Sequence, residues 1–247
     1  MANHLKAVFY GVRDYPAFID ASQTMVDHIK LNDGIFIGDN LTAFNRNLGF
    51  LNDQKLVTSF NAHADSTAEE APIWRIYVNC YFAKRAMALD GDFVECACYC
   101  GTTARIIADY VDLGDSDKSM WLYDLFEHDD DRRHLDMQEH GTGLFEEVEA
   151  RFADLDNAHV IQGEVPAILA ERAPERISHL HLDLNDETAE LAALEFFFDR
   201  LVTGGTIIFD DYGWLAYRAQ EAAEDAWLAE CGFSALELPT GQGLLIK

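Results

Sequence analysis

The sequence predicts an α/β fold in which a doubly wound parallel sheet ends in an antiparallel hairpin. From about residue 92 onward, short apolar runs alternate with longer amphipathic stretches, a pattern typical of βαβ units. Near the end of the chain, two apolar runs are separated only by residues 239–243, too short a link for a crossover helix, so these strands should be antiparallel. With 247 residues, 49% of them hydrophobic, the chain can bury a substantial core.

The expected elements follow in order along this region. Strands are expected at residues 92–97, 120–124, 159–161, 177–183, 206–210, 233–238 and 244–247. Helices are expected at residues 102–111, about 143–155, 166–172, 187–201 and 216–231. Five βα units closed by a hairpin resemble the Rossmann-like class I S-adenosylmethionine (SAM) methyltransferase fold. A nicotinamide-binding Rossmann domain would be expected to keep a parallel sixth strand.

The first ninety residues differ from the rest of the chain in composition and in hydrophobic periodicity. Residues 36–41 and 46–51 mix Asn, Asp, Gly and aromatic side chains without a clean period, whereas residues 73–89 have helical periodicity. We expect an N-terminal accessory region at residues 1–72 and the methyltransferase domain at residues 73–247. The accessory region is interpreted as a helical cap over the active edge of the sheet. A helical buttress remote from the site is the alternative.

The charge limits the partners. The chain has 18 Lys and Arg against 44 Asp and Glu, a net charge of −26. Nucleic acid and anionic membrane surfaces are therefore not expected partners, because phosphate binding needs clustered basic residues. Divalent cations remain compatible with this charge. No stretch is apolar enough to span a bilayer, and the N-terminus lacks a secretory pattern, so we expect a cytoplasmic protein.

Five cysteines are an odd number, and three of them alternate at Cys96, Cys98 and Cys100. This is neither a zinc-site spacing nor a disulfide framework. We interpret them as small buried hydrophobes in a reducing compartment, with a redox or soft-metal site as the minority alternative.

The turn after the first predicted strand is a candidate cofactor site. Residues 94–104 run from strand through a small-residue turn into a helix, where a ligand can approach backbone amides. A SAM carboxylate would use those amides, and Glu95 would hold the methionine amino group. As a glycine fingerprint the segment is weak, since only Gly101 remains, and an ordinary tight turn is the alternative.

Two further strand tips carry polar residues. Asp124 ends the second strand and is placed to accept hydrogen bonds from ribose hydroxyls, with a helix cap or a solvated acid as the alternative. Gln162, Gly163 and Glu164 follow the third strand, where adenine is often contacted, although a surface turn is equally compatible.

The fourth and fifth strands end in acids, Asp183 on one and Asp210 and Asp211 on the other. Neighbouring strands place these carboxylates at one edge, where they would repel one another without a cation. An oxygen-rich cluster suits Mg²⁺, Mn²⁺ or Ca²⁺. The alternative is that Asp183 and Asp211 cap helices and no ion binds.

The histidines carry less information. His181 shares a strand face with Asp183 and is a candidate base or supporting group, although a structural histidine is the alternative. His128, His134 and His140 are base candidates only because of where their loop should lie.

Several of these segments resemble the macrocin O-methyltransferase family. The similarity covers about residues 73–247 and rests on residues 91–101, 122–124, 182–183 and 204–212, with the Gly-Gly, strand, Asp-Asp-Tyr sequence as its strongest part. The family methylates sugar hydroxyls of natural products with SAM and Mg²⁺. The resemblance implies that Glu95 and Gly101 hold the methionine part of SAM and Asp124 the ribose. It also implies that Asp183, Asp210 and Asp211 hold the metal.

The turn departs from the family pattern. Ala97 stands where the family usually has glycine, Cys100 where arginine is frequent, and Thr102 where a further glycine is common. These changes narrow the space beside the cofactor, which Cys96, Ala97 and Thr102 are expected to line.

The leading hypothesis is a metal-dependent SAM O-methyltransferase that acts on a hydroxyl of a sugar-containing or polyhydroxylated small molecule. Asp183 and His181 are its candidate catalytic residues. Alternatives are a catechol or phenol O-methyltransferase, with Trp214 or Tyr217 lining an aromatic slot, a nicotinamide oxidoreductase, or a non-catalytic SAM-binding protein. The resemblance also allows a homodimer.

Overall fold

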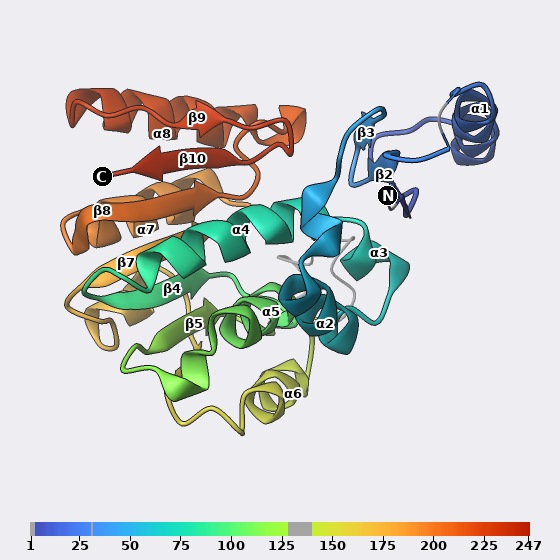
Figure 1. Ribbon diagram of the computed structural model, residues 1–247. Helices are drawn as coiled ribbons and strands as arrows, with labels where there is room; N and C mark the ends of the chain where they lie inside the picture. Colours follow the sequence, from blue (N-terminus) through green and yellow to red (C-terminus); the bar gives the residue numbers. More distant parts are fainter. Residues whose placement is uncertain (1–2, 31, 128–139) are drawn as a thin grey trace. The chain divides into compact units, whose positions relative to one another are not determined.

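The computed structural model describes residues 3–30, 32–127 and 140–247, and the chain forms two compact units, Met1–Tyr77 and Val78–Lys247. The division falls inside helix α4 (Ile73–Ala86), a few residues after the boundary expected before residue 73. Each unit contains its own sheet (Figure 1). Within the described ranges, no helix combines the length and apolar character needed to cross a membrane.

The first unit contains a three-stranded sheet in addition to its helices, which the sequence prediction missed. Strand β2 (Phe36–Gly38) pairs in parallel with β1 (His4–Leu5) and in antiparallel with β3 (Leu41–Ala43). The two residues between β2 and β3, Asp39 and Asn40, have φ values of 50° and 55°. Positive φ at both central residues is typical of a type I′ hairpin turn. The Asp-Asn pair could therefore have indicated this hairpin from the sequence alone.

Helices complete the first unit. They are α1 (Tyr15–Asp27), the 3₁₀ helix η1 (Gly49–Asn52), α2 (Gln54–His63) and α3 (Thr67–Glu70). Asp53 caps α2 by accepting hydrogen bonds from two backbone amides, and Ser66 and Glu69 form a capping box at α3. Phe36 packs edge-on against Trp74, which also contacts Phe50.

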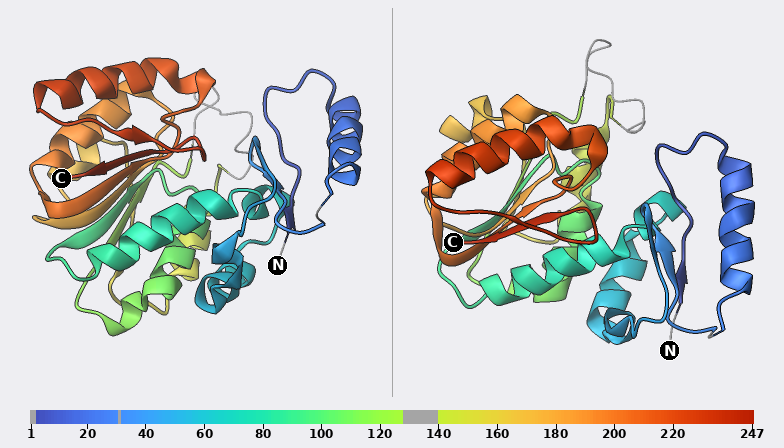
Figure 2. Two further views of the ribbon diagram at one scale, coloured as in Figure 1. Left: turned by 45° about the horizontal axis from the view of Figure 1, so that its top comes forward. Right: turned by 90° about the horizontal axis from the view of Figure 1, so that it is seen from above.

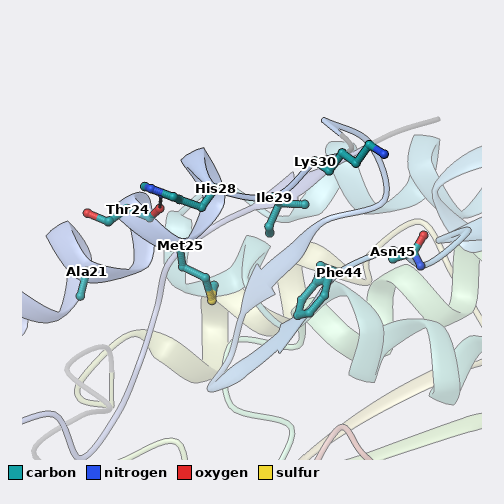
Figure 3. A pocket seen from close by; sticks show the side chains of 8 residues that line it. All are labelled: Ala21, Thr24, Met25, His28, Ile29, Lys30, Phe44 and Asn45. Atoms are coloured by element: carbon teal, nitrogen blue, oxygen red, sulfur yellow. Dashed lines mark hydrogen bonds between the residues drawn. The ribbon is translucent and has the colours of Figure 1, made fainter.

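An open groove lies within the first unit, between the α1 region and the segment after β3. Figure 3 shows side chains from α1 and the residues after it on one side and Phe44 and Asn45 on the other. The groove is lined by Ala21, Thr24, Met25, His28, Ile29, Lys30, Phe44 and Asn45. This lining contains no Asp or Glu side chain.

The second unit is built on a seven-stranded sheet with strand order β6-β5-β4-β7-β8-β10-β9. Its strands are β4 (Asp92–Cys96), β5 (Met120–Asp124), β6 (Ala158–Gln162), β7 (Ile177–Leu182), β8 (Leu201–Phe209), β9 (Leu236–Glu237) and β10 (Gly243–Ile246). The first five of these pair in parallel, while β10 is antiparallel to both β8 and β9. The predicted topology is confirmed, including the adjacency of β7 and β8.

Helices cover both faces of this sheet. Helix α5 (Thr102–Val111) and the α4 residues of this unit lie on one face, with α7 (Glu187–Phe198) and α8 (Arg218–Glu230) on the other (Figures 1 and 2). Helix α6 (Leu144–Arg151) follows β5. A fully buried core lies between β7, β8 and the α7–α8 pair, and it includes Leu180, Leu194, Phe197, Ile207 and Leu228.

Several predicted bounds were wrong in detail. Leu201 begins β8 instead of ending α7, and the stretch predicted as a helix at 166–172 forms only a 3₁₀ turn, η3 (Ala167–Ala170). Helix α8 begins at Arg218 after the 3₁₀ turn η4 (Leu215–Tyr217), and β9 covers only two residues of 233–238. Strand β4 ends at Cys96 because the next residue, Ala97, has left-handed backbone.

Candidate functional site

The carboxyl ends of β4, β7 and β8 meet at one edge of the large sheet. Strand register places Glu95 opposite His181, and Leu182 opposite Phe209. The hydrogen bonds continue beyond the strands, since the Asp183 amide donates to the Cys96 carbonyl (3.1 Å) and the Asp210 amide to the Leu182 carbonyl (2.9 Å). The edge therefore presents Glu95, Asp183 and Asp210 on three adjacent strands, as a doubly wound sheet does where it binds ligands.

The turn after β4 is tight and left-handed. Ala97, Tyr99 and Gly101 have φ values of 67°, 48° and 70°. The amides of Ala97 and Cys98 both donate to the Tyr123 carbonyl, at 2.7 and 3.2 Å, so they are committed to the sheet. Helix α5 begins at Thr102, a buried residue, without a side-chain cap, so its first amides are the groups in this turn suited to an anion.

Gly101 is required at its position. A Cβ on this residue would lie 2.9 Å from Phe152 Cε2, and φ is positive. Ala97 has no such crowding argument, but its φ of 67° is the conformation that a glycine would adopt without strain.

We expect Ala97→Gly to stabilise the protein by about 1 kcal/mol, because it relieves left-handed strain in a residue with a Cβ. Urea unfolding at equilibrium measures this. Ala108→Gly, at a buried position inside α5 beyond its first turn, is the matched control and should destabilise the fold by at least about 1 kcal/mol. A loss of stability in Ala97→Gly would contradict the strain argument.

The prediction of buried cysteines holds for two of the three in this turn, whereas Cys100 is half-buried, and outside the turn Cys231 is exposed. Cys96 and Cys98 are buried, and burial raises the pKa of both thiols well above the usual value. All five cysteines are free thiols. A buried protonated thiol is a poor nucleophile and a poor metal ligand, which favours the packing interpretation.

Asp124 connects the loops that follow β4 and β5. Its carboxylate accepts hydrogen bonds from the amides of Tyr99 and Phe126, each at 2.7 Å, and lies 3.3 Å from His140 Nε2. The His140 ring also packs on Tyr99, with centroids 4.8 Å apart. Asp124 is thus a buried carboxylate that holds the loops after β4 and β5 together at this edge. Its contact with a ribose stays a prediction. His128 and His134 lie outside the described residues.

The tip of β6 is more exposed. The Gln162 side chain donates to the Leu125 carbonyl at 3.2 Å, and the Gly163 amide donates to the Asp124 carbonyl at 3.0 Å. These contacts bring Gln162 and Gly163 beside Asp124, and their contact with an adenine stays a prediction.

His181 lies between two carboxylates. Its Nδ1 is 3.0 Å from Glu95 Oε1 and its Nε2 is 3.2 Å from Asp210 Oδ1. Burial disfavours the imidazolium, but the two carboxylates outweigh burial and raise the pKa of His181 well above 6.5. A protonated imidazole cannot accept a further proton, so this arrangement favours a supporting role over that of a general base.

Three side chains converge as metal ligands would. Within the described ranges, His181, Asp183 and Asp210 each offer a ligand atom, and these atoms lie within 4.8 Å of one another. Gln242, which the sequence prediction missed, donates to Asp210 Oδ1 at 2.9 Å and accepts from the Thr240 hydroxyl at 3.0 Å. The sequence could have indicated Gln242, because this residue lies in the predicted turn before the last strand, and that strand pairs with β8 at the end that carries Asp210.

Asp211 has a different environment. Its charge helps to raise the pKa of Glu190, a buried residue of α7, for which burial and then the charge of Glu224 are the larger causes. Glu190 also accepts a hydrogen bond from the Leu184 amide at 3.0 Å. Among the described residues, the three-ligand group thus contains His181 in the place that the sequence prediction gave to Asp211.

Comparison with known proteins finds methyltransferases of similar fold. A family model described as a methyltransferase domain matches residues 94–212. The O-methyltransferase NovP superposes with a TM-score of 0.60 at 17% identity, over 72% of this chain and 81% of NovP. CalS11, described as a calicheamicin methyltransferase and as a TDP-rhamnose 3′-O-methyltransferase, gives 0.54 at 16% identity, over 83% of this chain and 94% of CalS11.

The S-adenosylhomocysteine (SAH)-bound methyltransferase PaMTH1 of Podospora anserina gives a TM-score of 0.53 at 11% identity, over 97% of this chain and all of PaMTH1. No curated protein is significantly similar to this chain in sequence. The chain has the class I SAM methyltransferase fold, and the domain match supports a SAM-dependent methyltransferase enzyme.

Proposed function

We propose that this protein is a SAM-dependent O-methyltransferase that acts on a hydroxyl of a sugar-containing or polyhydroxylated small molecule with the help of a divalent metal ion. The observation that carries the proposal is the convergence of Glu95, His181, Asp183 and Asp210 at the carboxyl edge of a sheet with the methyltransferase strand order. The sugar acceptor is supported by the likeness to CalS11, one of whose descriptions names a sugar nucleotide.

The cofactor would occupy the edge formed by β4, β5 and β6. The uncapped start of α5 would face the SAM carboxylate, and Glu95 would attract the amino group. Asp124, which Tyr99 and Phe126 hold in place, would accept from the ribose, with Gln162 and Gly163 beside the adenine.

The residues present fit a divalent ion. Asp183 and Asp210 are half-buried carboxylates on adjacent strand ends, and Gln242 fixes the second of them. When bound, the ion would supply a Lewis acid that lowers the pKa of the acceptor hydroxyl. The chain's own contribution would be positional, because Asp183 and Asp210 would orient the acceptor oxygen toward the methyl carbon.

Replacing Asp124 with asparagine should weaken SAH binding about 10- to 100-fold, because hydrogen bonds to a charged acceptor contribute roughly 1.5–3 kcal/mol. Isothermal titration calorimetry with SAH measures this. Asp199→Asn, an exposed acid just before β8 at the opposite edge of the sheet, is the control and should bind SAH as the wild type does. Equal SAH affinity in Asp124→Asn would contradict the cofactor placement.

Turnover distinguishes the acceptor classes. Purified protein with SAM and Mn²⁺ or Mg²⁺ would be incubated with sugar nucleotides, glycosides and catechols, and SAH release measured by mass spectrometry. Activity with sugar hydroxyls supports the proposal. Activity confined to catechols would move the acceptor to the phenolic class, and SAH binding without any turnover would favour a non-catalytic SAM-binding protein.

A further inference from the structure

We propose that the divalent ion is held by His181 together with Asp183 and Asp210, with Glu95 orienting the imidazole, so that the site prefers Mn²⁺, Fe²⁺ or Co²⁺ over Mg²⁺. The inference rests on the proposed function and makes it more specific, since it replaces an all-carboxylate set with a mixed nitrogen and oxygen set. Imidazole suits first-row transition metals, whereas Mg²⁺ favours oxygen ligands alone.

The first argument is the position of the ring. Strand register places His181 beside Glu95, and its Nε2 faces the Asp210 carboxylate at 3.2 Å. A nitrogen of this ring belongs to the group of ligand atoms that lie within 4.8 Å of one another. An ion among them would take the place of the Nε2 proton, because a ligating histidine is neutral.

The second argument is the outer hydrogen bonding. A metal-ligating histidine almost always donates its other ring N–H to a carboxylate or carbonyl. His181 Nδ1 meets this condition with Glu95 at 3.0 Å, and both groups are buried. The carboxylate ligand is fixed as well, since Gln242 donates to Asp210 and is itself held by Thr240. Two of the three ligands therefore already have orienting partners.

An independent observation comes from Asn79 of α4. This residue is 1% exposed, and its Nδ2 lies 3.4 Å from His181 Nε2, yet its Oδ1 has no hydrogen-bond partner. Buried side-chain oxygens are rarely left unpaired without a reason such as an ion or its water ligand. The amide nitrogen of this side chain is next to the proposed ligand nitrogen, and a water bound to the ion would supply the donor that Asn79 Oδ1 lacks.

Asp211 is the residue that His181 would replace. Within the described part of the chain, Asp211 does not join the three-ligand group. Asp211→Asn is therefore a matched control for substitutions in the ligand set.

The decisive measurement is pulsed EPR of Mn²⁺ bound to the full-length wild-type protein. We expect ¹⁴N modulation from a coordinated imidazole, and protein labelled with ¹⁵N-histidine should replace it with a ¹⁵N pattern. By calorimetry, Mn²⁺ and Co²⁺ should bind at least about tenfold more tightly than Mg²⁺. Glu95→Gln should weaken Mn²⁺ binding about 10- to 100-fold.

The variants give a second test. His181→Gln should abolish the ¹⁴N signal and weaken Mn²⁺ binding by about tenfold or more, while Asp211→Asn keeps both. Bound Mn²⁺ without histidine modulation in the wild type would overturn the inference, as would loss of Mn²⁺ binding in Asp211→Asn alone. Neither result touches the proposed methyl transfer, which SAH binding and turnover test separately. The wild-type spectrum decides the question even if His181→Gln fails to fold.

Discussion

Replacing Asp210 with asparagine should abolish methyl transfer while leaving SAH affinity nearly unchanged. Asp210 lies between His181 and Gln242 at the end of β8, so the substitution removes the charge of one proposed metal ligand while keeping its shape. Lewis-acid stabilisation is worth several kcal/mol, and each 1.36 kcal/mol is tenfold in rate. We therefore expect turnover to fall by about 10²-fold to 10³-fold or more, measured as SAH release under saturating SAM.

Asp117→Asn is the control for this variant, because Asp117 is an exposed acid just before β5 at the opposite edge of the sheet. It should have wild-type turnover. Calorimetry with SAH shows whether Asp210→Asn is folded and binds cofactor. Undiminished turnover in Asp210→Asn would refute the role given to the carboxylate, whichever ion is bound.

Glu224→Gln should make the protein more stable at pH 8 by about 2–3 kcal/mol. Glu224 of α8 is 1% exposed, and burial raises its pKa from 4.5 to about 7, with each unit worth about 1.36 kcal/mol. The folded state therefore binds more protons than the unfolded state between these two values. Stability should fall as pH rises through that window and then level off above pH 7.

A neutral glutamine removes the contribution of Glu224 to this dependence, so the gain should be small near pH 4.5 and full at pH 8. The raised pKa of Glu190 leaves a residual pH dependence in the variant. Chemical unfolding at both pH values measures it. Glu230→Gln is the control on the same helix, since Glu230 is exposed at the last residue of α8, and its stability should follow the wild type. A Glu224→Gln protein that is equally or less stable at pH 8 would contradict the assigned burial cost.

Local sequence pattern was sufficient for the large sheet. The apolar runs predicted all seven strands, and the five-residue link before β10 predicted its antiparallel direction, because that link cannot hold a crossover helix. The hydrophobic pattern gave the wrong element or the wrong bound where the backbone conformation of one or two residues decided the secondary structure. The left-handed Asp39 and Asn40 turn created a hairpin in a region predicted as helical, and the left-handed Ala97 ended β4 one residue early.

The sequence by itself placed the acids at the strand ends, because a strand's end is marked locally by the change from apolar to polar residues. Only the tertiary structure decided which groups meet there. Glu95 and His181 are 86 residues apart and become partners through strand register, while Gln242 reaches Asp210 because β10 is inserted beside β8. Asp210 and Asp211 are neighbours in the chain, but among the described residues only Asp210 joins His181 and Asp183 in the three-ligand group, which local sequence could not indicate.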